Sequence, residues 1–224
     1  MEAPGHSGAA TSSPDTGPDN TLLKCRNDVL EATLHVGDTD VVVEIRFLCV
    51  GPLHKMTWKL CSRSRDPFAV PLLALNCYAV FVAYDGLIYR VYDQRSDDTA
   101  KSVRICGEAR VKQLVAAGDR MHYVDEEGRV YSFGSATHGE LGLGVCCMAT
   151  DAEKLTAEQV QGLPVIEQIE VTDFHTMAVT ESGETYFWGW NPDDELGGDF
   201  GVMEWLPKKL DADCDSSVEG GDKA

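Results

Sequence analysis

Apolar and polar residues alternate over residues 41–48, which is the pattern of a β-strand with one buried face. One face carries Val41, Val43, Ile45 and Phe47, and the other carries Val42, Glu44, Arg46 and Leu48. Turn signals bracket this run, with Gly37-Asp38 before it and Gly51-Pro52 after it. Residues 28–62 are therefore predicted to form a meander of about three antiparallel strands.

Three further segments share a hairpin pattern centred on a glycine turn, at Asp85-Gly86, Glu127-Gly128 and Ser182-Gly183. A tyrosine stands three residues after each glycine and a valine four residues before it, at Tyr89, Tyr131 and Tyr186 and at Val82, Val124 and Val179. Glycine permits the positive φ of a tight turn, and tyrosine and valine suit a half-buried strand. The copies lie 42 and 55 residues apart, a spacing typical of a four-stranded propeller blade.

The second and third copies agree over a longer stretch. An aromatic residue followed by glycine comes five positions after the turn glycine, at Phe133-Gly134 and Trp188-Gly189. Glu-Leu-Gly then follows at residues 140–142 and 195–197, where the leucine is expected to anchor a loop in the core. A glycine beside a large ring indicates a place where a neighbouring backbone passes closely.

These segments resemble repeats of the regulator-of-chromosome-condensation family. The resemblance is specific over residues 111–145 and 165–198, weak over 70–93 and absent before residue 67. The string Trp188-Gly189-Trp190-Asn191 is similar to that of small animal proteins holding a single such domain. The resemblance implies a seven-bladed β-propeller that serves in protein–protein recognition.

Chain length changes that expectation, because seven blades need about 350 residues. The residues between the two predicted tails suffice for roughly four blades. The predicted fold is all-β, a partial or reduced β-propeller of about four blades built from antiparallel four-stranded units. A four-bladed ring, a partial ring completed by a partner and an incomplete version of a longer protein all remain open. The predicted divisions are a disordered tail at 1–20, a diverged β-meander and possible first blade at 21–66, the repeats at 67–210 and an acidic disordered tail at 211–224.

Several repeat residues are predicted to serve the fold. His175 occupies a packing position on a strand, whereas Trp188 and Trp190 face the same side and serve either packing or a binding hot spot. Arg120 is expected to be partly buried and to pair with Asp119 or Glu126. The residues assigned to the repeat framework are Gly86, Tyr89, Gly128, Tyr131, Phe133, Gly134, Leu141, His175, Gly183, Tyr186, Trp188, Gly189, Trp190 and Leu196.

The chain carries 37 acidic and 19 basic residues, a formal net charge of −18. Such a surface repels phosphate, which argues against nucleic acid and an anionic membrane as direct partners. It favours another protein with a basic segment.

Cysteine spacing, catalytic motifs and targeting segments limit the classes of protein that the sequence can represent. None of the eight cysteines forms a Cys-x-x-Cys pair, and reduced cysteines in an intracellular protein are expected. The sequence shows no phosphate-binding loop, nucleophile elbow or zinc-protease motif, so neither an enzyme nor a cofactor or metal is predicted. With no signal peptide and no long apolar stretch, a nuclear or cytoplasmic protein that is not secreted is expected.

The loops after the two strong repeats are the candidate partner-binding sites. Their residues are His138 and Glu140 in the earlier loop and Asp193, Asp194, Glu195 and Asp199 in the later one. The predicted function is a non-catalytic protein-interaction scaffold. The resemblance suggests a chromosome- or spindle-associated role with a histone-modifying oxygenase as partner. The alternative it implies is a guanine-nucleotide exchange factor for a small GTPase, with direct chromatin binding ranked last because residues 1–20 contain no basic residue.

Overall fold

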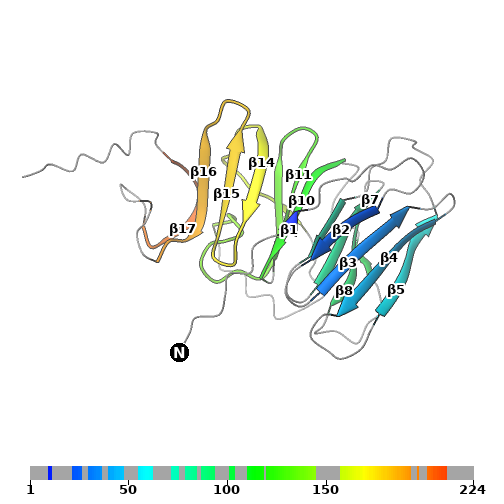
Figure 1. Cartoon of the computed structure of the whole chain (residues 1–224). Coiled ribbons are helices and arrows are strands. Elements are labelled where there is room, and N and C mark those ends of the chain that lie inside the picture. Colours follow the sequence, from blue (N-terminus) through cyan, green and yellow to red (C-terminus); the bar gives the residue numbers. More distant parts are fainter. Residues whose placement is uncertain are drawn as a thin grey trace, which may run out of the picture.

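The computed structural model contains seventeen strands and, within the residues it describes, no helix. The described residues are 10–11, 22–26, 30–36, 40–47, 55–62, 72–75, 79–84, 87–93, 101–103, 110–118, 120–144, 157–192, 196 and 201–210. The strands form four antiparallel sheets that stand side by side along the molecule (Figure 1).

Each sheet is built largely from strands that follow one another in the sequence. The first sheet contains β2 (Leu22–Arg26), β3 (Leu30–Val36), β4 (Asp40–Phe47) and β5 (Lys55–Ser62). The second contains β1 (Ala10–Thr11), β6 (Leu72–Leu75), β7 (Ala79–Tyr84), β8 (Leu87–Asp93) and β9 (Lys101–Val103). The third contains β10 (Val111–Ala117), β11 (Arg120–Asp125), β12 (Val130–Gly134) and β13 (Glu158–Gln159). The fourth contains β14 (Ile166–Val171), β15 (His175–Thr180), β16 (Thr185–Trp190) and β17 (Met203–Lys209).

The leading strands of the sheets lie beside one another. Strand β6 contacts β2 on one side and β10 on the other, and β10 contacts β14. This succession of four-stranded antiparallel units around a shared inner row of strands is the arrangement of propeller blades.

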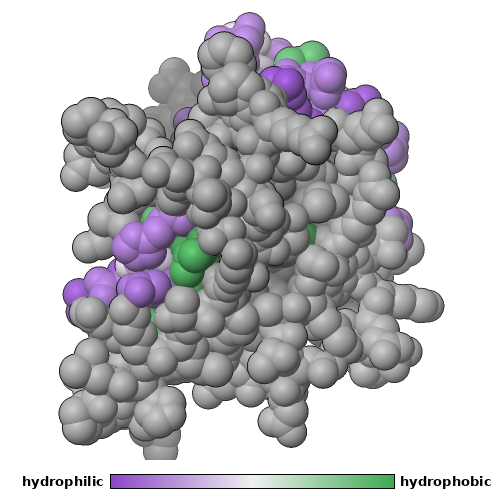
Figure 2. Space-filling view, turned by 90° about the vertical axis from the view of Figure 1, so that its right-hand side faces the viewer, coloured by the Kyte–Doolittle hydropathy of each residue, from purple (hydrophilic) through white to green (hydrophobic). Residues whose placement is uncertain are grey.

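Residues 28–62 form the predicted meander of three antiparallel strands, β3, β4 and β5. The departure is β2, which adds a fourth strand before residue 28. Its short mixed sequence, Leu-Leu-Lys-Cys-Arg, carries no clear alternation, so the pattern did not reveal it. The predicted alternation is present in β4, where Val41, Val43 and Ile45 are fully buried and Val42 and Glu44 are partly exposed. Figure 2 views the molecule from the side that carries β2–β5. The atoms coloured by hydropathy in this view are mostly hydrophilic, with small apolar groups between them.

A second departure concerns the segment predicted as a disordered N-terminal tail. Ala10 and Thr11 form β1, which pairs with Leu75 and Ala74 of β6. Strand addition uses backbone N–H and C=O groups, so a segment without large apolar side chains can still extend a sheet. The remaining residues of 1–20 and all of 211–224 lie outside the described part of the chain.

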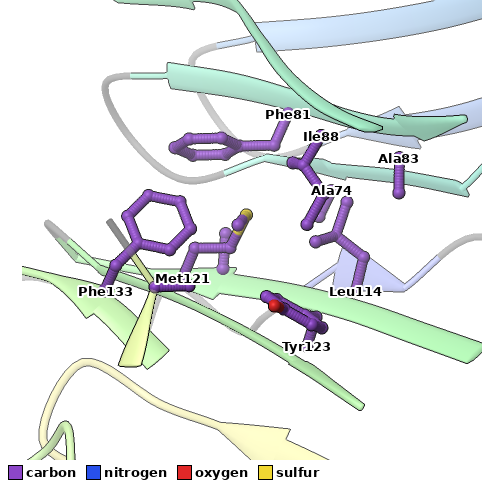
Figure 3. Packing of buried hydrophobic residues seen from close by; sticks show 10 residues of the cluster. Ala74, Phe81, Ala83, Ile88, Leu114, Met121, Tyr123 and Phe133 are labelled. Carbon is purple, nitrogen blue, oxygen red and sulfur yellow. The ribbon is translucent and has the colours of Figure 1, made fainter. Parts of the chain in front are cut away.

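Apolar side chains fill the space between the second and third sheets. Phe81 of β7 and Phe133 of β12 face each other there, with ring centroids 6.1 Å apart and planes at 78° (Figure 3). The cluster also contains Ala74, Ala83, Ile88, Leu114, Ala116, Met121, Tyr123 and Ala157. Aromatic edge-to-face packing of this kind adds to the free energy gained by burying the rings.

A second apolar cluster joins the third and fourth sheets around Trp188, whose side chain is fully buried. Its other buried members are Val115, Ala117, Val124, Val130, Val160, Ile166, Ile169, Val171 and Ala178. A polar link reinforces it, because the side-chain amide of Gln113 donates to the carbonyl of Ile169 and accepts from its N–H, both at 2.8 Å. This side chain thus completes two backbone bonds of the neighbouring sheet.

The hairpins explain why the repeat pattern is strong in two copies and weak in one. In the third and fourth sheets the turn glycines Gly128 and Gly183 have φ of +74° and +84°, which the tight turn requires. Those turns contain three residues, closed by bonds from Asp125 to Arg129 and from Thr180 to Glu184. In the second sheet Tyr84 pairs with Leu87, so that hairpin has a shorter connection and Tyr89 meets Val82 instead.

Candidate protein-binding face

The third and fourth sheets have two chemically different ends. The hairpin turns at 126–128 and 181–183 lie at one, the hairpin end. At the other, the loop end, lie the β10–β11 and β14–β15 turns together with the loops that follow β12 and β16. The predicted partner-binding loops both start at this loop end.

Residue Glu140 joins the two sheets at the loop end through its main-chain carbonyl. That oxygen accepts hydrogen bonds from His122 Nε2 at 3.2 Å, Thr176 Oγ1 at 3.0 Å and Trp188 Nε1 at 3.0 Å. One donor belongs to the third sheet and two belong to the fourth. The loop after β12 is therefore fixed at a single point that both sheets hold.

The side chain of Glu140 forms a buried ion pair. Its Oε1 lies 3.8 Å from Arg120 Nη1, and both side chains are nearly inaccessible to solvent. Its Oε2 accepts the main-chain N–H of His138 at 2.7 Å, while Arg120 Nη2 donates to the carbonyl of Thr172 at 2.6 Å. The carboxylate and guanidinium thus compensate each other inside the protein.

This pair changes two expectations. Glu140 was expected on an exposed partner-binding loop, but its side chain is buried and holds the loop in place. Arg120 was expected to pair with Asp119 or Glu126, and it lies beside the carboxylate of Glu140 instead of that of Glu126. Glu126 follows β11 at the hairpin end and is separated from Arg120 by the length of the strand, about 20 Å, and Asp119 lies outside the described residues.

Two glycines let the loop lie flat on its neighbours. A Cβ atom at Gly139 would come within 2.5 Å of the Glu204 carbonyl oxygen, and one at Gly142 within 2.9 Å of Trp188 Nε1. Their φ angles of +85° and +71° fall in the left-handed region that glycine adopts readily. The Glu-Leu-Gly signal in the sequence therefore reflects close packing of the loop against β16 and β17.

His122 is enclosed in the same interface. Burial, and then the charge of Arg120, lower the pKa of His122 from its ordinary value of 6.5 to about 3. Its ring is neutral at neutral pH, because a charged imidazole would lose its hydration beside a cation. Its Nδ1 has no hydrogen-bond partner among the described atoms.

Acid is expected to destabilise the protein through His122. The unfolded chain takes up a proton near pH 6.5 and the folded chain only near pH 3, so stability is fully present above pH 6.5 and falls below it. The slope from this one group is about 1.4 kcal/mol per pH unit. Urea unfolding at pH 7, 6 and 5 should show it in the wild type and in the exposed-site control His138→Gln. The slope should shrink in His122→Gln, and an unchanged slope there would assign the acid sensitivity to other groups.

An aromatic patch lies on the surface above this buried network. We use this name for His138, Phe174 and Trp190 together with Val202 and Met203. His138 stacks on Trp190 with centroids 5.1 Å apart and planes at 23°, and Phe174 meets Trp190 edge-on at 5.2 Å and 68°. Met203 is the register partner of Trp190, and the Val202 carbonyl accepts the N–H of Asn191.

The patch gathers most of the exposed apolar surface among the described residues. Their exposed large apolar side chains are Val165, Phe174, Val202, Met203 and Leu206. Three of these five border Trp190, and Leu206 lies further along β17 against Gly144 of the same loop. Val165, by contrast, lies at the hairpin end beside Gly128. Aromatic rings and methionine collected in one place are typical of interface hot spots.

The predicted site residues thus separate into three groups. His138 is on the patch, with its side chain 42% exposed, and Glu140 is beneath it. Asp193, Asp194, Glu195 and Asp199 lie outside the described residues, so their placement stays a prediction. Trp188 and Trp190 do face the same side, since both contact residues 138–140, but only Trp190 reaches the surface.

The remaining framework residues lie in the strands and turns. Tyr131 stacks on Tyr123 at 4.8 Å, Leu141 is buried, and His175 packs against Phe187. Gly86 and the side chain of Tyr89 are outside the described residues. No site role was predicted for Phe174, Val202 or Met203. The aromatic-His pair at 174–175 was the available signal, but it indicated a strand rather than a surface.

Two kinds of feature are absent from the described residues, a metal site and a membrane-spanning helix. No group of three or more His, Cys, Asp or Glu side chains there is placed to hold a metal ion. The same residues include no helix long and apolar enough to cross a membrane.

The comparisons with known proteins agree with this architecture. Residues 127–179 match the family model described as the regulator of chromosome condensation (RCC1) repeat. The chain is 34% identical over 89 residues to human RCC1 domain-containing protein 1, and this match covers 40% of the chain and 23% of the human protein. It is 33% identical over 90 residues to the ultraviolet-B receptor UVR8 of Arabidopsis thaliana, covering 39% and 19%. The matched segments thus span less than a quarter of either relative.

A solved structure shows the same fold. The crystal structure of human WBSCR16 superimposes with a TM-score of 0.56 and 13% sequence identity, over 81% of this chain and 49% of that one. The predicted resemblance and the all-β fold of antiparallel four-stranded units are confirmed. The matched repeat begins in the hairpin before β12 and ends in β15, so it contains the loop that joins the third and fourth sheets.

Proposed function

Because residues 127–179 form a repeat of the regulator of chromosome condensation family, we propose that this protein is a non-catalytic protein-interaction scaffold whose binding face is the loop end. The observation that carries the proposal is the aromatic patch. Phe174 is 44% exposed and Met203 40%. Phe174 meets Trp190 edge-on and lies two residues before Thr176, whose hydroxyl donates to the Glu140 carbonyl, and Met203 is the register partner of Trp190. A rigid scaffold that presents large apolar side chains loses little conformational entropy on binding.

Charge supports a protein with a basic segment as the partner. The net charge of −18 raises the encounter rate with such a segment and lowers it for nucleic acid and for anionic membranes. The resemblance to the repeat family suggests chromosome- and spindle-associated proteins, including histone-modifying oxygenases, as the first classes to test.

The proposal predicts that partner capture depends on Phe174. The tagged chain should retain a protein from cell lysate in near one-to-one ratio. Phe174→Ala should bind it at least about fivefold more weakly, since a hot-spot ring contributes about 1 kcal/mol or more. Quantitative mass spectrometry measures the ratio. The matched control is Val165→Ala, which removes an exposed apolar side chain at the hairpin end.

The outcomes separate the alternatives. Equal retention by Phe174→Ala and Val165→Ala would contradict a binding site on the patch. Thermal unfolding of each variant excludes loss of fold as the cause, and little change is expected because both side chains are exposed. A small GTPase as the retained protein would favour nucleotide exchange, which accelerated release of its bound nucleotide would establish.

A further inference from the structure

We propose that the aromatic patch binds an arginine side chain of an extended basic segment. This inference rests on the proposed function and names the chemistry of its partner. The occupant is a segment of another protein that stacks a guanidinium on the exposed rings and directs a main-chain carbonyl to Asn191.

The ring arrangement supplies the first argument. His138 and Trp190 are nearly parallel, whereas Phe174 stands at 68° to Trp190, so the patch presents ring surfaces in two orientations. The side chains of His138 and Phe174 are both close to half exposed. Cations bind over aromatic faces, and guanidinium groups do so most often because they are planar and weakly hydrated.

The second argument is a buried donor without an acceptor. Asn191 directly follows Trp190, and its side chain is only 5% exposed. Its Nδ2 has no hydrogen-bond partner among the described atoms, although its main-chain N–H donates to Val202 at 2.7 Å. An unsatisfied buried amide is unfavourable, and a carbonyl of a segment lying across Trp190 would satisfy it.

Electrostatics supplies the third argument. Two cations at the loop end are already paired, Arg120 with Glu140 and Lys208 with Glu204. The positive charges of these two side chains are therefore each balanced by a neighbouring carboxylate. Together with the charge of −18, this favours an incoming cation. A lysine ammonium would keep its hydration shell, which favours arginine for a stacked site.

The test uses fluorescein-labelled hexa-arginine and hexa-lysine with the full chain in physiological salt, measured by fluorescence anisotropy. Both peptides should feel the acidic surface, but hexa-arginine should bind at least about threefold more tightly because only guanidinium stacks well. Phe174→Ala should weaken hexa-arginine roughly threefold to tenfold and leave hexa-lysine nearly unchanged. Phe174→Tyr should retain the preference, and Val165→Ala should match the wild type.

Equal affinities for the two peptides, or an equal effect of Phe174→Ala on both, would overturn the inference and reduce the binding to general charge attraction. If Phe174→Ala loses binding to both peptides and its unfolding temperature also changes, the tyrosine variant becomes the test. Failure of Phe174→Tyr to keep the arginine preference would also overturn the inference. Partner capture that depends on Phe174 without any arginine preference would leave the proposed function standing and reject the arginine anchor.

Discussion

Replacing Glu140 with alanine should lower the free energy of unfolding by about 3–5 kcal/mol, because it leaves a buried guanidinium without its carboxylate. The Arg120 side chain would keep its bond to the Thr172 carbonyl but lose the charge 3.8 Å away. The main-chain N–H of His138 would lose its acceptor as well. Urea unfolding followed by tryptophan fluorescence measures the loss.

Two controls separate burial from charge. The double variant Arg120→Met, Glu140→Leu removes both charges and should recover much of the loss, since apolar replacements of a buried pair are often tolerated. Glu184→Ala breaks the exposed pair with Lys209 and should cost about 1 kcal/mol or less. A Glu140→Ala loss as small as that of Glu184→Ala would show that the ion pair does not stabilise the loop after β12.

Replacing Trp188 with alanine should lower the free energy of unfolding by about 3–5 kcal/mol, the range for removing a fully buried aromatic side chain. The ring fills the space between the third and fourth sheets, and its Nε1 donates to the Glu140 carbonyl at 3.0 Å. Trp188→Phe keeps most of the volume and loses this hydrogen bond, so a smaller loss of about 1–2 kcal/mol is expected.

The same urea unfolding measurement on Phe174→Ala serves as the control for Trp188→Ala. Phe174→Ala removes a ring that is 44% exposed and should change stability far less. If Trp188→Ala and Phe174→Ala proved equally mild, the cluster around Trp188 would not be the main contact between the sheets.

Local signals predicted the strands well because they depend on neighbours in sequence. The glycine turns at 127–128 and 182–183 and the alternation over 41–47 each specify a conformation through residues a few positions apart. The first hairpin was aligned with the others on its glycine, but its connection is one residue shorter. Strand β2 was missed because five residues of mixed character carry no period.

The site was less predictable because it depends on contacts between sheets. Glu140 stands among glycines, which is also the composition of an exposed loop, and only the fold shows that its carboxylate meets Arg120. The patch combines residues from the loop after β12, the turn before β15, the end of β16 and the start of β17. No sequence period connects these positions.

We propose that the loop end, and not the hairpin end, is the binding face. Hydrogen–deuterium exchange of the full chain with and without its captured partner distinguishes the two ends. Slower exchange on binding is expected at residues 137–142, 172–176 and 190–192, with no change at the hairpin turns 126–128 and 181–183. Protection confined to those hairpin turns would contradict it.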